Sequence, residues 1–286
     1  MKKKTLVWMM ALCLIASALG GCGSKEEGTA VERKVLRVGM ECAYAPFNWT
    51  QTGKEVANGD QAEPIYGTNE YAYGYDIMVA QMLAEEMGFT LEIHKVDWSS
   101  IILAMNAGDY DCIIAGMADS EERQQQVDFT STYYIRNNVL VVRKDSPYAS
   151  ATSLADFTGA SATTQIGTIW EEYVPQIPDV EQLTYFETTS EIMMAVAMNA
   201  ADCGIVDEPT AISAAIANPD LTYVVLPEGA GFEIPEGQTN NVCIAVREGD
   251  SELLGLLNDA LASCEWTPDK MEASMSEAVK YQPLNN

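Results

Sequence analysis

Hydrophobic and polar residues alternate along the first half of the chain in a way that predicts strands and helices in turn. Short apolar or alternating runs predict strands at 35–40, 90–96 and 111–115. Between them, apolar residues at helical spacing predict helices at 76–87 and 99–106, and a glycine soon follows each helix. A regular order of strand, helix and strand indicates βαβ units, so we expect an α/β fold with a mostly parallel sheet.

The same rhythm restarts after Tyr134. It predicts strands at 139–143, 161–165, 183–186, 203–206, 221–226 and 241–247. It also predicts helices at 190–200, 209–217, 252–264 and 270–281, another that starts near 169, and a short helical turn at 154–157. We therefore expect a second α/β unit after the first.

Two segments of the chain repeat one another. The sequence AMNAGDYDC at 104–112 is echoed by AMNAADC at 197–203, and each runs from a helix end into the start of a strand. Two similar βαβ lobes would produce this echo. The long polar segment 50–71, rich in glycine and asparagine, predicts a surface loop at the mouth of the first lobe.

The first residues of the chain predict export. Three lysines precede an apolar stretch at 6–19, and small residues lead to Cys22; this order is typical of a secretory signal peptide, expected here at 1–21. The stretch is short for a transmembrane helix. A cysteine after leucine and two small residues resembles the bacterial lipobox, which implies cleavage before Cys22 and a lipid on its sulfur. The alternative is a plain signal peptide with an incidental cysteine.

The polar, charged segment that follows predicts a tether. Residues 22–33 would comprise the lipidated Cys22 and a flexible linker without apolar periodicity. No later hydrophobic stretch is long enough to span a bilayer. We therefore expect an exported protein, anchored by its lipid to the outer face of the cell membrane or to the periplasmic face.

The charge of the chain excludes two classes of partner. The net charge is −26, and removal of residues 1–21 would take away three lysines and no acidic residue. A surface this acidic repels nucleic acid and anionic lipid headgroups, so we expect neither as a partner.

The cysteines and the single histidine offer little catalytic chemistry. Five cysteines follow Cys22, an odd number without C-x-x-C spacing, and the sequence leaves open whether any two form a disulfide: Cys42, Cys112, Cys203, Cys243 and Cys264. His94 falls on the polar side of a predicted strand. We therefore expect no metal site, no cofactor and no histidine-based acid–base chemistry.

The junction at 113–123 carries the strongest local signal for binding. An apolar strand ends at Gly116, a helix is predicted from Ser120, and Arg123 falls in its first turn. Asp119 has capping-box spacing to Glu122, and Ser120 is a second candidate cap. Free backbone groups and a planar cation together suit a carboxylate. The alternative is an ordinary strand–helix junction with a surface arginine.

Taken in order, the motifs of this chain resemble the extracytoplasmic solute-binding proteins of polar amino acid ABC importers. The segments that carry the resemblance are 36–41, 44–47, 74–77, 98–102, 115–123, 127–134, 165–168, 207–208 and 244–247. It implies a two-lobed periplasmic-binding-protein (Venus-flytrap) fold, each lobe a mostly parallel sheet flanked by helices. Lobe 1 would comprise 34–136 plus 241–286 and lobe 2 would comprise 137–240, joined by a two-strand hinge.

The resemblance also implies which residues hold the main-chain groups of an amino acid. Arg123 matches the arginine that clamps the α-carboxylate, and the Gly116 carbonyl and Asp207 match the partners of the α-ammonium. Asp207 has an alternative role as the cap of a helix that begins near Pro209. Ala118 matches a position usually held by serine or threonine, so only its N–H would contribute. Thr168, Ile169 and, less directly, Gln165 match the loop of lobe 2 that closes on the ligand.

The remaining matched positions would recognise the ligand's side chain. Tyr44 and Trp98 match two positions whose rings sandwich it, although both could be core aromatics. Glu41 matches an acidic position that meets the distal polar group, which favours an amide or a cation. The ligand hypothesis is therefore a polar or basic amino acid: arginine, lysine, ornithine, histidine or glutamine. Phe47 and Trp49 are expected to pack at the rim of the pocket.

The function implied is that of a monomeric, membrane-anchored receptor. It would bind a free amino acid between its lobes and deliver it to the transmembrane subunit of an ABC permease, and it would not be an enzyme. One alternative is a cyclohexadienyl or arogenate dehydratase-like enzyme on the same fold. Another is a sensory solute-binding lipoprotein. The role of Asp119 stays open, because a carboxylate that faced the cleft would weaken the assignment of Arg123.

Overall fold

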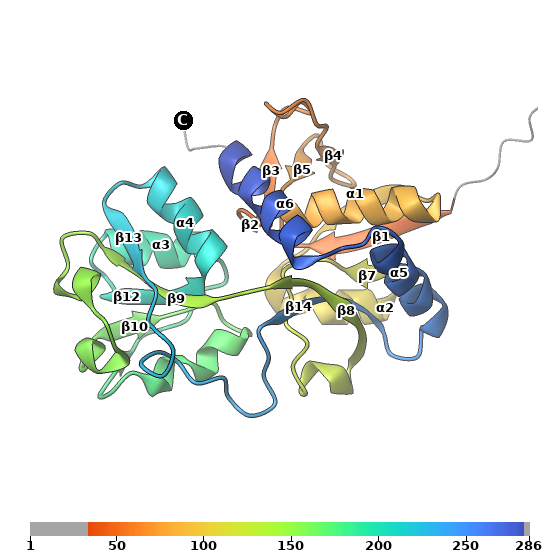
Figure 1. Ribbon diagram of the computed structural model, residues 1–286. Helices are drawn as coiled ribbons and strands as arrows, with labels where there is room; N and C mark the ends of the chain where they lie inside the picture. The colour runs from red at the N-terminus through yellow and green to blue at the C-terminus, as the bar shows by residue number, and fades with distance from the viewer. Residues whose placement is uncertain (1–33, 283–286) are drawn as a thin grey trace, which may run out of the picture. The chain divides into compact units, whose positions relative to one another are not determined.

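The computed structural model describes residues 34–282. The predicted signal peptide, Cys22 and the tether to residue 33 lie outside the described residues. In the first of two five-stranded sheets the strands lie in the order β6-β1-β7-β14-β8. Figure 1 labels four of them: β1, β7, β14 and β8. The bounds of the five strands, in sheet order, are Thr90–Lys95, Val35–Met40, Cys112–Ile113, Asn241–Arg247 and Val127–Ile135.

The second sheet has the order β11-β10-β12-β9-β13. Its strands are Glu181–Gln182, Ser161–Thr163, Cys203–Asp207, Asn138–Arg143 and Leu221–Val224. The chain passes from the first sheet to the second directly, since only two residues, 136 and 137, lie between the end of β8 and the start of β9. It returns to the first sheet at β14.

The expectation of parallel strands holds for three strands in each sheet. Strand β1 runs parallel to β6 and β7, and β10 runs parallel to β11 and β12. By contrast, β14 is antiparallel to both of its neighbours, and so is β9. A parallel neighbour requires a long crossover, usually a helix. Strands β9 and β14 instead enter their sheets straight from the crossing segments, so both sheets are mixed.

The internal echo corresponds to equivalent places in the two sheets. Helix α2 (Ile101–Ala107) leads into β7, and helix α3 (Thr189–Ala197) leads into β12. Both strands occupy the central position of their sheet. The repeated sequence therefore marks the same helix–strand step in each sheet.

Helices cover both sheets. Helix α2 packs on β1, β7 and β14, whereas α5 (Ser251–Ser263) and α6 (Pro268–Tyr281) both pack on α1 (Tyr75–Met87) and on β8. In the second sheet, α3 packs on β9 and β12, and α4 (Glu208–Ala217) packs on β9, β12 and β13. Helix α1 ends at Met87, directly before Gly88, as the sequence predicts. Gly88 adopts a left-handed conformation (φ 70°) that other residues rarely accept, so the helix does not continue.

Part of the segment predicted as a surface loop is paired. A four-stranded sheet of order β2-β3-β5-β4 contains Ala43–Tyr44, Asn48–Gln51, Tyr71–Tyr73 and Glu63–Pro64. Its strands are two to four residues long, which is too short for a period-2 pattern to stand out in the sequence.

Three other local expectations were wrong. No α-helix follows Ser120; a single 3₁₀ turn, Arg123–Gln125, precedes β8. A 3₁₀ turn, Ile169–Glu172, replaces the helix expected after Thr168, and the strand expected at 183–186 is reduced to a bridge between Gln165 and Phe186. In the first case β8 begins at Val127, so fewer than two full helical turns could follow Ser120. The further 3₁₀ turns are Trp98–Ser100, Pro147–Ser150, Leu154–Phe157 and Val174–Gln176.

Within residues 34–282, no helix is both long enough and apolar enough to cross a membrane. All five cysteines of this range are free thiols, and only Cys264 is partly exposed. Across the same range, no group of three or more histidine, cysteine, aspartate or glutamate side chains is placed to hold a metal ion.

Candidate functional site

A small cavity brings most of the predicted site together. Its volume is about 10 Å³, and it is lined by Glu41, Tyr44, Trp98, Ala115, Gly116, Arg123, Arg136, Gln165, Thr168, Ile169 and Trp170. Most of these residues come from segments that adjoin the two five-stranded sheets, whereas Tyr44 lies in β2 of the four-stranded sheet. All the predicted ligand-binding residues except Ala118 and Asp207 are among them. A space of this size admits about one water molecule, so an amino acid requires side chains or whole elements to move.

Glu41 lies directly after β1 and is only 6% exposed. The side-chain amide of Gln165 donates to its Oε1 at 2.9 Å, and the same amide nitrogen donates to the Glu187 carbonyl at 2.8 Å. Burial raises the pKa of Glu41 to about 8, and the Gln165 hydrogen bond offsets only part of that rise. The carboxyl group is therefore largely neutral at pH 7, and a cation placed beside it would favour its ionisation.

Asp207 is the N-cap of α4, as one of the two sequence interpretations proposed. The backbone N–H of Thr210 donates to Oδ1 at 2.9 Å, and the Thr210 hydroxyl donates to Oδ2 at 3.1 Å. The hydroxyl of Tyr44 also donates to Oδ2. Burial raises the pKa of Asp207, whereas the Tyr44 hydrogen bond and the charge of Arg136 act in the opposite direction. The capping role is confirmed, and the role toward a ligand stays a prediction.

Arg123 is held by backbone carbonyls instead of carboxylates. Its Nη1 donates to the Ala118 carbonyl at 3.0 Å and its Nη2 to the Gly167 carbonyl at 2.9 Å. Its guanidinium carbon lies 5.2 Å from the centre of the Trp98 ring, whose Nε1 donates to the same Gly167 carbonyl at 3.1 Å. Burial lowers the pKa of Arg123 to about 10, and the nearby charge of Arg136 adds to this effect. Arg123 remains a cation at neutral pH.

Arg123 also lines a larger hollow of about 470 Å³. This hollow shares Trp98, Thr168 and Ile169 with the small cavity, and its lining also includes Glu122 and Glu171. Arg123 therefore lies where the small cavity and an open, partly acidic hollow share their lining. The alternative of an ordinary surface arginine does not describe this position.

Asp119 does not line the small cavity. Its carboxylate accepts a hydrogen bond from the hydroxyl of Thr239, and its backbone carbonyl accepts one from Gln124. Ser120, the second candidate cap, accepts a 3.4 Å hydrogen bond from the backbone N–H of Arg123. The capping box is not formed, and without an α-helix there is no helix N-terminus to hold a carboxylate. Any anion site here depends on Arg123.

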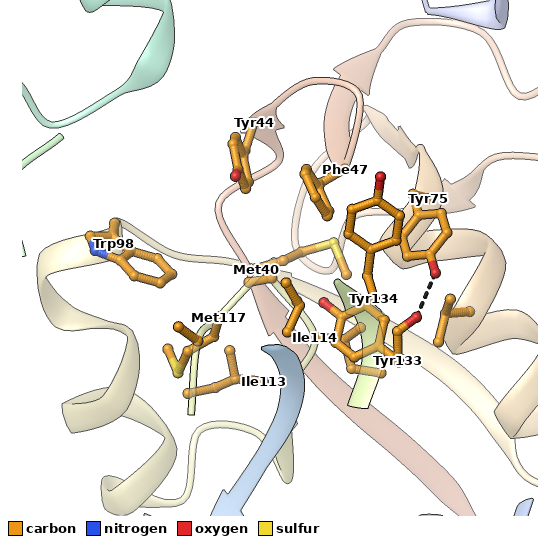
Figure 2. Close-up of a cluster of buried hydrophobic side chains, with 14 of the residues drawn as sticks. Met40, Tyr44, Phe47, Tyr75, Trp98, Ile113, Ile114, Met117, Tyr133 and Tyr134 are labelled. Atoms are coloured by element: carbon orange, nitrogen blue, oxygen red, sulfur yellow. Dashed lines mark hydrogen bonds between the residues drawn. The ribbon is translucent and has the colours of Figure 1, made fainter. Parts of the chain in front are cut away.

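Gly116 has a conformation and surroundings that exclude other residues. Its φ is +61°, and a Cβ would lie 2.6 Å from Cε1 of Tyr44. Its N–H donates to the Tyr133 hydroxyl at 2.9 Å, and that hydroxyl donates to the buried carboxylate of Asp76 at 2.7 Å. In Figure 2, Tyr44 and Trp98 lie toward the edge of the aromatic cluster that contains Tyr133. The buried hydrogen bonds from Gly116 through Tyr133 to Asp76 thus hold the backbone of Gly116 in place.

The two predicted sandwich rings contact the protein's own side chains. Tyr44 stacks on Phe47 with ring centres 4.8 Å apart, while Trp98 faces Arg123. Phe47 and Trp49 are buried packing residues. The hydroxyl of Thr168 donates to the Gln165 carbonyl at 2.7 Å. The sandwich therefore stays a prediction, although both rings line the same cavity.

Sequence reasoning missed Arg136 and Trp170. Arg136 lies between β8 and β9, is 5% exposed and donates through Nη2 to the Gly116 carbonyl. Its guanidinium carbon lies 5.6 Å from the Trp170 ring centre, and the Trp170 Nε1 donates to Asn138 at 2.9 Å. The available signal in the sequence was a single arginine, followed by two asparagines, between the apolar runs YYI and VLVV at the expected hinge.

The sequence and the fold have known relatives. Residues 36–268 match the family described as bacterial extracellular solute-binding proteins, family 3. The arginine-binding extracellular protein ArtP of Bacillus subtilis (strain 168) is 30% identical over 265 residues, which cover 92% of this chain and 93% of ArtP. A probable histidine-binding protein of Neisseria gonorrhoeae is 27% identical over 260 residues, covering 88% and 87%.

Among solved structures, an ancestral arginine-binding protein bound to arginine is 28% identical and superposes with a TM-score of 0.66. The superposition covers 87% of this chain and 99% of that protein. The expected two-lobed periplasmic-binding-protein fold is thereby confirmed, and the relatives are binding proteins, not enzymes. The matched region spans both five-stranded sheets, and the chain belongs to family 3 of the bacterial extracellular solute-binding proteins.

Proposed function

We propose that this protein captures a free polar or basic amino acid and delivers it to an ABC permease. The ligand would lie between lobe 1 (34–136 plus 241–286) and lobe 2 (137–240), and the protein would be held at the membrane by a lipid on Cys22. Relatives named for arginine and histidine binding support the class of ligand. The lipobox-like sequence before Cys22 supports the anchor.

The observation that carries this proposal is the pairing of opposite chemistries in one cavity. Arg123, which has no acidic partner within residues 34–282, lines the same space as Glu41 and two aromatic rings. A zwitterionic ligand with a distal polar group needs both: a planar cation for its carboxylate and an acceptor for its far end. Tyr44 and Trp98 would cover the part of the ligand between them.

The energies are of the right order. A hydrogen bond to a charged group contributes about 1.5–3 kcal/mol net, and a bidentate guanidinium–carboxylate pair makes two. A micromolar affinity corresponds to about 8 kcal/mol. Arg123 alone would therefore supply a large share of the affinity for any amino acid, and Glu41 and the rings would set the preference among them.

Entry of the ligand would use a hinge motion. Hydrogen bonds of Tyr44 to Asp207 and of Gln165 to Glu41 join the two lobes across the cavity. Within the described residues the chain crosses between the sheets at 136–137 and at 225–240, and the backbone N–H of Arg136 donates to the Asn240 carbonyl at 2.9 Å between these two segments. Rotation about these segments would separate the lobes while leaving each sheet intact.

A thermal-shift screen followed by calorimetric titration tests the proposal. Arginine, lysine, ornithine, histidine and glutamine are expected to raise the melting temperature, because a ligand that binds only the folded state stabilises it by mass action. Arg123→Ala should abolish the response to all of them. Arg143→Ala is the matched control, since Arg143 pairs with Asp145 on the surface and should leave the response unchanged.

Two results would count against the proposal. Tight binding of glutamate with none of arginine or glutamine would remove the assigned role of Glu41. Unchanged affinity in Arg123→Ala would remove the carboxylate clamp. Separately, Cys22→Ala should release the protein from the membrane fraction of cells that express the full chain, and retention there would exclude lipid anchoring through Cys22.

A further inference from the structure

The arginines at the cavity differ from the other arginines of the fold. Among residues 34–282, Arg37, Arg143 and Arg247 each form an ion pair with an aspartate. Arg123 and Arg136 form none within the same range, although both lie in a protein of net charge −26. Two cations thus line one small cavity without a direct ion pair, although the charge of Arg136 also acts on the nearby carboxylates of Asp207 and Asp76.

The groups expected to bind the ligand's α-ammonium are already engaged. The Gly116 carbonyl accepts a hydrogen bond from Nη2 of Arg136. The Asp207 carboxylate accepts hydrogen bonds from Tyr44 and Thr210. An ammonium group that entered here would have to displace the guanidinium of Arg136 or compete with it. The acceptor groups in this part of the site therefore already have hydrogen-bond donors and do not require a further cation.

The groups that lack a partner are N–H donors, which an anion would satisfy. Nε of Arg136 is buried and has no hydrogen-bond partner, and Arg123 reaches only neutral carbonyls. The two positive charges also repel each other, which contributes to the lowered pKa of Arg123. A buried donor without a partner is costly. An oxyanion between the two guanidinium groups would satisfy these N–H donors and cancel the repulsion.

We propose that Arg136 is a specificity-determining residue that forms, with Arg123, a two-arginine site for the ligand's carboxylate and competes with its α-ammonium for the Gly116 carbonyl. This rests on the proposed function and refines its ligand class. The site requires a carboxylate and depends only weakly on an amino group at the neighbouring carbon. It therefore accepts 2-hydroxy acids that carry the same polar or basic side chains.

The test compares amino acids with their 2-hydroxy counterparts. Calorimetric titrations of the mature protein would use L-arginine, L-lysine, L-histidine and L-glutamine, and for each the (S)-2-hydroxy acid with the same side chain. The variants are Arg136→Gln, which removes the charge, and Arg136→Lys, which keeps the charge but loses the planar fork. Arg143→Gln is the control for loss of an arginine outside the site.

For the amino acid that binds the wild-type protein best, the 2-hydroxy counterpart should bind within tenfold. Arg136→Gln should increase the preference for the amino form at least tenfold, because it frees the Gly116 carbonyl for the α-ammonium group, whereas the loss of one carboxylate contact weakens both forms alike. Arg136→Lys should lie between the two, and Arg143→Gln should match the wild type.

The outcomes are distinct. A wild-type preference for the amino form above tenfold, or a preference unchanged in Arg136→Gln, overturns this inference and leaves the proposed function standing. Binding of the hydroxy acids alone supports the two-arginine site and overturns the assignment of amino acids as ligands. Binding of neither set overturns both. The wild-type ratio decides the inference even if Arg136→Gln does not fold.

Discussion

Gln165 donates a 2.9 Å hydrogen bond to Glu41, which joins the loop after β10 to the end of β1. The bond is made to a carboxyl group whose pKa burial raises to about 8. Since an amide N–H donates to either form of a carboxyl group, the contact persists when Glu41 is neutral. The burial of Glu41 therefore destabilises the folded protein more as the pH rises and the carboxyl group ionises.

The first prediction concerns the stability of Glu41→Gln. The folded-state pKa of Glu41 is about 8, above its ordinary value of 4.5, so the folded protein favours the protonated form. The wild type should therefore lose stability relative to the variant as the pH rises from 4.5 to 8, by up to about 1.4 kcal/mol per pH unit.

Melting temperatures of the two proteins at pH 5, 6, 7 and 8 measure this effect. The advantage of Glu41→Gln should be small at pH 5 and should grow up to pH 8. Glu181→Gln, a substitution of an exposed residue, controls for the change in net charge. A difference in melting temperature that stays constant over this range would contradict the assigned pKa.

The second prediction concerns the pH dependence of ligand affinity. A ligand with a cationic side chain would bind best when Glu41 is ionised, so its affinity should rise between pH 6 and pH 8. Glutamine, whose amide interacts with the neutral carboxyl group as well, should show a flatter profile. Titrations of arginine and glutamine against wild type and Glu41→Gln would measure both profiles. A rise for arginine that persists in the variant would assign the titration to another group.

The sequence predicts the parts of the fold whose signals are local. Gly88 ends a helix where expected because only a left-handed residue closes that turn. Glu41, Gly116 and Gln165 come together because each lies one to three residues after the end of a strand, and the carboxyl ends of parallel strands meet at one edge of a sheet.

What the sequence did not predict depends on non-local pairing. Strand β8 does not show clear alternation, and its place in the sheet is set by β14, more than a hundred residues away. Arg136 looks like an ordinary polar residue at the end of a strand, and only the fold brings it to the Gly116 carbonyl. The helix expected after Ser120 failed because strand pairing from Val127 overrides a weak helical preference.

The third prediction tests the polar chain beneath the site. Tyr133→Phe removes the acceptor of the Gly116 N–H and a donor to Asp76, which leaves buried polar groups unpaired. We expect a loss of about 1–3 kcal/mol in the free energy of unfolding and weaker ligand binding, because Gly116 is no longer held in place.

Tyr75→Phe is the matched control for this change. The Tyr75 hydroxyl donates to the Tyr133 carbonyl at 2.6 Å, as the dashed line in Figure 2 shows, and that carbonyl also accepts from Trp266 at 2.9 Å. After loss of the Tyr75 hydroxyl, the Tyr133 carbonyl therefore still has a hydrogen-bond donor, and ligand affinity should be unchanged. Urea denaturation and calorimetric titration of both variants would separate the two effects. Equal loss of affinity in both would show that general packing, and not the Gly116 contact, supports the site.

The fourth prediction uses two glycines that share a conformation but not their surroundings. Gly116 (φ +61°) would place a Cβ 2.6 Å from the ring of Tyr44, whereas Gly108 (φ +93°) has no atom within 4 Å of that position. Gly108→Ala should cost only the strain of a left-handed residue, about 1–2 kcal/mol in the free energy of unfolding. Gly116→Ala should cost more and should also weaken ligand binding, because Tyr44 must move away from Asp207. Urea denaturation and titration with the ligand of the wild type measure both quantities. Equal costs in the two variants, with unchanged affinity, would show that the Tyr44 ring yields freely and does not shape the site.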